Sequence, residues 1–308
     1  MSNAPFKTDP VRTAIALAYR NEAFIADMVL PRAPVSGEEF KWTSYNKEDR
    51  FTIPDTTVDR KGAINQVEFG GTEQGSMTND YGLQDVIPQK DIDSAVAAGF
   101  DVQGNATELL TDVVMLGREA RVAAMVHTAA NYPAANKETL AAGDKWTAAT
   151  GDPIEQLTAA MEIPMMRPNV MQLSSAGALA LRRNEKIVKA YHGNTGTDGL
   201  VPLEFIRQLF ELDQIIVGRA RYNSANPGQN MTLTRLWADN ALLFYRNSSA
   251  MPNRGLTFGL TAQFGSRMAM SKRDDDVGLR GATIQRVGES VKELIIANDT
   301  AYLITGVV

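Results

Sequence analysis

Residues 105–130, NATELLTDVVMLGREARVAAMVHTAA, carry the strongest helix signal in the chain. Asn105 is a suitable N-cap, and Glu108 follows three positions later, as in a capping box. Apolar side chains recur at helical spacing along one face, at Leu109, Val113, Leu116, Ala120 and Ala123. At the usual rise per residue this helix would be about 39 Å long. Pro133 prevents it from continuing, so the sequence predicts one long helix over residues 105–130.

Short helices and strands are interleaved after this helix. Asp152 and Pro153 mark a helix start, because a capping carboxylate precedes a proline at the first helical position, and Pro164 ends that helix. The remaining predicted elements are a buried strand at 167–175, a helical stretch from 179 that ends near Gly193, a helix at 202–212, a strand at 213–222 indicated by its apolar residues 215–217, and a loop at 223–239.

The C-terminal part of the chain is rich in strand signals. Residues 240–246 predict a strand, and residues 256–264 alternate strictly between apolar and polar side chains. The segments 290–297 and 301–308 flank Asn298-Asp299 and predict an antiparallel hairpin. Because helices and strands interleave without a regular βαβ period, the predicted fold class is mixed α+β.

The N-terminal part differs in character. Residues 11–35 predict a short helix or irregular arm that ends in an extended segment fixed by Pro31 and Pro34. Residues 36–88 contain strand-type residues, turn formers and charges but little apolar content. A two-stranded excursion of this kind is marginally stable alone, so it needs another surface. If the chain's own core does not supply that surface, a neighbouring subunit must.

Composition excludes several function classes. The 308 residues are enough for about two domains, and 44% hydrophobic with 22% charged residues indicates a folded protein. The sequence predicts neither secretion nor a membrane span, since it lacks a signal peptide and a long apolar run. The absence of cysteine excludes disulfides and thiolate sites. A net charge of −5 argues against a protein dedicated to gripping nucleic acid.

No arrangement of residues predicts an enzyme, and we expect no catalytic, cofactor or metal site. The glycine-rich segment 193–199 lacks the lysine and spacing of a phosphate loop. The run from Asp274 to Asp276 lacks calcium-loop spacing and favours a solvated turn. His127 and His192 have no partner histidine and are expected to be structural or on the surface.

Two basic groups are the places where a phosphate backbone could be touched, although a solvated or intersubunit face is the favoured interpretation. One comprises Arg182, Arg183, Lys186 and Lys189, of which Arg182 and Lys186 would share a helix face, and the other comprises Arg267, Lys272 and Arg273.

The order of these elements resembles the major capsid proteins of tailed bacteriophages, which have the Hong Kong 97 fold. The segment IALAYRNEAFIADMVLPRAPV resembles the family's N-terminal arm, and the strand-rich segment after it resembles the extended loop. Residues 105–130 resemble the spine helix, and DPIEQLTAAMEI followed by RPNVMQLSSAGALALRRNEKIV resembles elements of the peripheral domain. The resemblance covers most of the chain.

The resemblance implies a division into five parts. These are an N-terminal arm at 1–35, an extended β loop at 36–88, a peripheral domain at 89–189, an axial domain at 190–246 and a return to the peripheral sheet at 247–308.

The implied function is that of a structural protein. Copies would form hexamers and pentamers of an icosahedral shell that encloses double-stranded DNA, contacted weakly because the chain is acidic. Assembly would take place in the host cytoplasm with a separate scaffolding protein, because only about ten residues precede the arm, and the shell would include a portal. A cementing protein is left open. An encapsulin-like compartment shell of the same fold is the alternative, and an enzyme with an unfamiliar fold is a third.

Six apolar side chains are the candidates for inter-subunit contact in such a shell. They are Phe40, Trp42, Phe51 and Ile53 on the loop, with Phe24 and Ile25 on the arm. Some members of the family crosslink subunits through a lysine, but nothing around Lys41, Lys47 or Lys61 predicts that bond here.

Overall fold

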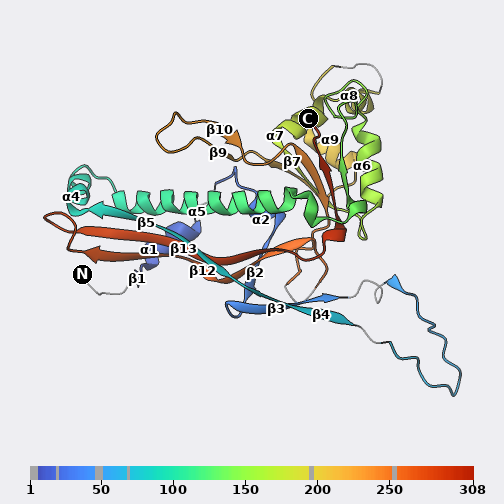
Figure 1. The fold of residues 1–308 in the computed structure, drawn as a ribbon, viewed down its shortest axis with the longest axis horizontal. Coiled ribbons are helices and arrows are strands. Elements are labelled where there is room, and N and C mark those ends of the chain that lie inside the picture. Colours follow the sequence, from blue (N-terminus) through green and yellow to red (C-terminus); the bar gives the residue numbers. More distant parts are fainter. Residues whose placement is uncertain (1–5, 19–20, 46–50, 68–69, 194–197, 252–254) are drawn as a thin grey trace.

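The computed structural model describes residues 6–18, 21–45, 51–67, 70–193, 198–251 and 255–308. Within them the fold is mixed α+β, which confirms the predicted class. One long helix, α5, runs along the length of an extended sheet, and a second sheet covered by short helices lies at one end (Figure 1). A thin β hairpin and a thin β ribbon project from this body on either side of α5 (Figure 1).

Helix α5 spans Val102–His127, close to its predicted range. Its N-cap is Asp101, whose side chain accepts hydrogen bonds from the backbone of Gln103 and Gly104, so the predicted cap at Asn105 was wrong. The predicted apolar stripe is buried only in part: Ala123 is 3% exposed, but Leu109 is 60% and Val113 is 52% exposed. The buried positions are instead a mixed set that includes Thr107, Thr111, Val114, Arg118, Glu119, Val122 and Val126.

The face that α5 buries is set by the sheet beneath it. This sheet has the order β1 (Lys7–Thr8), β12 (Gly259–Asp274), β13 (Ala282–Ile295) and β5 (Asn79–Pro88), and β2 (Arg32–Val35) lies parallel to β12. Helices α5 and α1 (Pro10–Ala18) pack on it. The strand β13 carries Glu289 and Glu293 among its buried residues, so the helix meets it with polar and charged groups.

Strand β5 belongs to this sheet along its whole length, paired antiparallel with β13 from Ala282↔Pro88 to Val291↔Asn79. Residues 79–88 were predicted to form part of the extended loop. The ribbon proper consists of β3 (Glu39–Tyr45) and β4 (Gly71–Met77), which pair antiparallel.

The second sheet has the order β6 (Lys137–Thr139), β14 (Ala301–Thr305), β11 (Asn240–Phe244), β7 (Val170–Ser174) and β8 (Gln214–Gly218). Its core includes Leu157, Met171, Leu181, Ile187 and Leu243. The helices that contribute to this core are α6 (Pro153–Glu162), α7 (Ser175–Arg183), α8 (Glu185–His192) and α9 (Leu203–Leu209).

Two predictions do not agree with the strand pairing in this sheet. The predicted hairpin of the last two strands was wrong, because β14 pairs with β11 and β6 whereas β13 pairs with β12 and β5. The short 3-10 turn Asn298–Thr300 carries the chain from one sheet to the other. The expected division between residues 189 and 190 also separates β7 from β8, although these two strands pair directly.

Sequence signals for the start of a helix were more reliable than those for strand pairing. Asp152 caps α6 by accepting from the backbone of Ile154 and Glu155, with Pro153 in the first turn, as predicted. The predicted helical stretch ends at Gly193 as expected, but it is broken at Asn184, whose side chain caps α8. Arg182 and Lys186 therefore lie on different helices and do not share a helix face.

The remaining elements are short. The arm contains α2 (Ala26–Val29), and α4 (Gln89–Ala97) precedes α5. The strands β9 (Arg221–Asn223) and β10 (Leu233–Arg235) form a hairpin, and β10 lies where a loop was predicted. Two further 3-10 turns lie at Ala129–Asn131 and Ala134–Asn136. None of the described helices is long and apolar enough to cross a membrane.

Candidate inter-subunit surfaces

The six predicted contact residues fall into two groups. Phe51 is 56% exposed and Ile53 is 93% exposed, in the segment that links the two strands of the ribbon. Every side chain described between residues 51 and 67 is exposed. These two residues are therefore free of the chain's own core and available to another surface.

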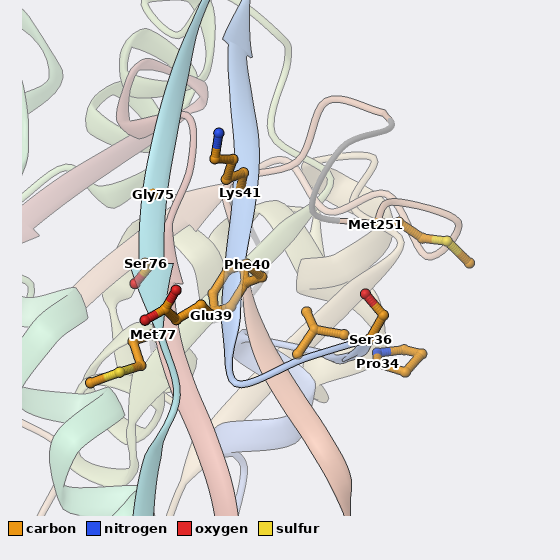
Figure 2. Close-up of a pocket in the computed structure, with 10 residues that line it drawn as sticks. Pro34, Ser36, Glu39, Phe40, Lys41, Gly75, Ser76, Met77 and Met251 are labelled. Atoms are coloured by element: carbon orange, nitrogen blue, oxygen red, sulfur yellow. The ribbon is translucent and has the colours of Figure 1, made fainter.

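The aromatic residues at the base of the ribbon lie differently. Phe40 is 8% exposed and packs with Ala33, Leu260 and Ala262, and the partly buried Trp42 packs against the same cluster. Phe40 lies beside an open groove between the ribbon and β2, with Met77 on its rim (Figure 2). Because Phe40 is buried in its own chain, it offers little area to a neighbour.

The arm residues are used inside the chain as well. Ile25 is 4% exposed and Phe24 is partly buried, and both contact the cluster that joins the arm to α5 and the second sheet. The burial of Ile25 and Phe24 therefore fixes the arm to its own subunit.

Glu119 of α5 binds both the arm and the segment that contains Trp237 through one carboxylate. Its carboxylate accepts hydrogen bonds from the backbone N–H groups of Ile25 and Ala26, both 2.8 Å away, and from Trp237 Nε1 at 2.7 Å. Burial raises the pKa of Glu119, and these three hydrogen bonds oppose that rise. The carboxylate thus joins the arm, α5 and the base of the β9–β10 hairpin.

A second charged group holds the arm to the long sheet. Glu289 Oε2 accepts from Arg32 Nη1 at 2.8 Å and from Arg267 Nη2 at 3.2 Å. Burial alone would raise the pKa of Glu289, but Arg32, Arg267 and Arg118 together lower it. Asp27 lies between Arg118 and Arg32, and Arg121 pairs with Glu293 at 2.9 Å.

These carboxylates were not anticipated from the sequence. An isolated Glu or Arg in a helix or strand usually lies in solvent, and no short motif distinguishes the few that are buried and paired. The alternation of β13 is the only local signal, since Glu289 and Glu293 share its face with Val287 and Val291.

The residues considered for chemistry lie apart from one another in the described part of the chain. His127 Nε2 lies 2.9 Å from Gln172 Oε1, and burial lowers the pKa of this histidine. His192 ends α8 and contacts the ring of Tyr191 edge-on. Among the described residues, no group of three or more carboxylate or histidine side chains could hold a metal. The run Asp274–Asp276 is therefore not such a group. Within the glycine-rich segment, residues 194–197 lie outside the described part of the chain.

Comparison with known proteins identifies relatives of this chain. The profile of a family described as phage major capsid protein E matches residues 131–271. The major capsid protein of Pseudomonas phage JBD67 is 47% identical over 98% of this chain and 97% of its own length. The major capsid protein of Burkholderia phage BcepMu is 24% identical, over 97% of this chain and 96% of its own.

Solved structures show the same fold. A phage-related protein from Bordetella bronchiseptica has a TM-score of 0.77 at 22% identity, with 99% of both chains covered. The capsid structure of the cyanophage P-SCSP1u has a TM-score of 0.59 at 14% identity, covering 94% of this chain and 89% of that one. The named relatives are phage proteins, which favours a phage capsid over an encapsulin-like compartment. The chain therefore belongs to the phage major capsid proteins of the Hong Kong 97 fold, and it is a structural protein rather than an enzyme.

Proposed function

We propose that copies of this chain assemble into hexamers and pentamers of an icosahedral shell that encloses double-stranded DNA. The observation that carries the proposal is the exposed segment 51–67 between β3 and β4, whose described residues include five large apolar side chains outside the core. They are Phe51, Ile53, Val58, Ile64 and Val67, each at least 47% exposed. A segment of this kind gains stability only when another surface covers it, and a second copy provides one.

Each part of the fold corresponds to one part of the proposed capsid subunit. The arm comprises residues before the ribbon, and the ribbon comprises β3, β4 and the segment between them. The long sheet with α5 corresponds to the peripheral domain, and the second sheet with its helices to the axial domain. Strand pairing supports this grouping, because β7 and β8 pair directly within the second sheet.

Other partners follow from the same proposal. A separate scaffolding protein would guide assembly in the host cytoplasm, and a portal would complete the shell; a cementing protein is a further candidate. Contact with the packaged DNA would be weak and independent of sequence, because the chain carries a net charge of −5.

The test is the assembly of the purified chain and of a ribbon variant. The unaltered chain should form capsomers, tubes or shells in light scattering and electron microscopy. The double variant Phe51→Ser with Ile53→Ser should keep native circular dichroism and cooperative melting but form no particles, because both side chains are outside the subunit's core.

Thr52→Ser provides the matched control, since it changes an exposed polar residue in the same segment and should assemble normally. A stable 33.5 kDa species under all salt and protein concentrations would contradict the proposal. Normal assembly of the double variant would show that these two side chains are not contacts.

A further inference from the structure

The β9–β10 hairpin is a projecting element with a fixed base. All side chains from Arg221 to Arg235 are exposed except that of Ala225, which is partly buried. At the base, Trp237 is 1% exposed and lies against Gly218, where a Cβ atom would be only 2.4 Å from the indole ring. The hairpin is thus held at its base, and the described part of its own chain leaves it uncovered.

The hairpin is positively charged in an acidic protein. The segment 214–238 contains Arg219, Arg221 and Arg235 and no Asp or Glu; Asp213 and Asp239 flank it, and Arg235 Nη1 lies 4.0 Å from Asp239 Oδ1. The ribbon region, residues 36–77, contains eight acidic and five basic residues and so has a net charge of −3. The two projecting elements of one chain therefore carry opposite charge.

The two elements also lie on opposite sides of the molecule. In Figure 1 the hairpin is above α5, and the ribbon extends below the long sheet and away from it. A ring of identical copies needs two different, complementary surfaces on each copy, because every subunit meets one neighbour with each side. Oppositely charged elements on opposite sides satisfy that requirement.

Both elements expose apolar side chains that could be buried together. On the hairpin, Tyr222 is 41%, Met231 is 68% and Leu233 is 52% exposed. On the ribbon, Phe51 and Ile53 are exposed to a similar or greater extent. Apolar contact would supply stability, and the opposite charges would select the correct pairing of surfaces.

We propose that the β9–β10 hairpin of one copy receives the acidic ribbon of the next copy in the capsomer. The inference rests on the proposed function, since it concerns a contact between assembled copies. It assigns the hairpin a partner of defined chemistry, namely the described ribbon residues 36–45, 51–67 and 70–77 of a second copy of this chain.

Cysteine crosslinking tests the contact directly, because the natural sequence has no cysteine. One preparation carries Met231→Cys and a second carries Ile53→Cys. The two are co-assembled and treated with a short bis-maleimide. Covalent dimers should form in the mixed particles at least tenfold more than in particles of either single variant. A chain with both substitutions should give a ladder up to the closed ring.

Leu279→Cys is the matched control, since Leu279 is 100% exposed in the turn between β12 and β13 and lies on neither element. Particles that form normally but crosslink no better through residue 231 than through residue 279 would overturn the inference while leaving the proposed function intact. In that outcome the hairpin is covered by something else, such as packaged DNA. Failure of the unaltered chain to form any particles would overturn both.

Charge reversal provides a second measurement. Arg219→Glu with Arg221→Glu should lower the yield of particles at least tenfold at low salt, while the subunit keeps its circular dichroism and melting curve. Arg167→Glu, at a 54% exposed side chain outside both elements, should leave the yield unchanged. An equal yield from the hairpin variant and this control would overturn the inference.

Discussion

Glu289 is the carboxylate on which the charged contacts of the long sheet converge. It is 3% exposed and accepts hydrogen bonds from Arg32 of β2 and Arg267 of β12. Removing one partner from a buried ion pair leaves the other charges without compensation, which costs more than the pair itself contributes. Glu289 therefore matters mainly because it compensates the buried Arg267 and the partly buried Arg32.

Glu289→Gln should lower the free energy of unfolding by about 3–5 kcal/mol. Glu73→Gln is the control, because the Glu73–Lys41 pair is exposed and should contribute less than about 1 kcal/mol. Chemical denaturation of the two variants measures the difference. Equal stabilities would mean that water or a rearranged side chain compensates the arginines.

The pH dependence of the same carboxylate has a definite sign. The folded state lowers the pKa of Glu289 below its ordinary value of 4.5, so the unfolded state binds more protons near that pH. Its contribution to stability is present above pH 4.5 and is lost as the pH falls below it. Unfolding curves measured from pH 7 downward should show this loss in the unaltered chain and a smaller loss in Glu289→Gln.

Glu119→Gln should release the arm without unfolding the second sheet. An amide has one acceptor oxygen, so it cannot replace a carboxylate that accepts from Ile25, Ala26 and Trp237 at once. Hydrogen exchange should become faster in residues 21–30, and the tryptophan fluorescence should change. Glu108→Gln, on the exposed face of the same helix, should change neither.

At the scale of elements, adjacent positions of α5 differ sharply in environment. Val114 is 6% exposed whereas Val113 is 52% exposed. Val114→Ala should destabilise the subunit by about 1–3 kcal/mol through lost packing, and Val113→Ala should change its stability by less than about 0.5 kcal/mol. Thermal melting of unassembled subunits tests this pair, and similar costs for both would place α5 in a different rotation on the sheet.

Helix α5 also shows what sequence could and could not predict. Its existence and length follow from local residues, as does the start of α6 at Asp152 and Pro153. Its buried face does not, because that depends on β13, which is distant in sequence and presents Glu289 and Glu293. The pairing of β14 with β11 and β6 rather than β13 is likewise decided by contacts outside the local segment.

The burial of the candidate contact residues also depends on residues that are distant in sequence. Alternation in β3 indicates that Phe40 and Trp42 share a strand face, but it does not say whether that face meets the chain's own sheet or another copy. Ala33, Leu260 and Ala262 decide this for Phe40. Phe51 and Ile53 were chosen by the same pattern, and no comparable cluster covers them in the described part of the chain.

At the scale of the whole molecule, the segment 51–67 should be the region most changed by assembly. A backbone hydrogen bond from Gly62 to Asp59 closes one turn there, but the segment contains no described strand. Its amides should exchange rapidly in free subunits and slowly in particles. Residues 170–174 of β7 are the internal control, since they are buried in the subunit and should be protected in both states. Equal exchange of residues 51–67 in both states would contradict the expectation.

The shared carboxylate of Glu119 has a thermodynamic consequence for the order of events in assembly. Because one side chain accepts from both the arm and Trp237, the free energy of docking the arm depends on whether Trp237 is in place. Reciprocity requires the converse dependence to be equal in size. Any partner that displaces the arm therefore changes the free energy with which Trp237 is held, and any partner that fixes Trp237 changes the affinity of the arm by the same factor. Two edges of the subunit are thus linked through one buried charge.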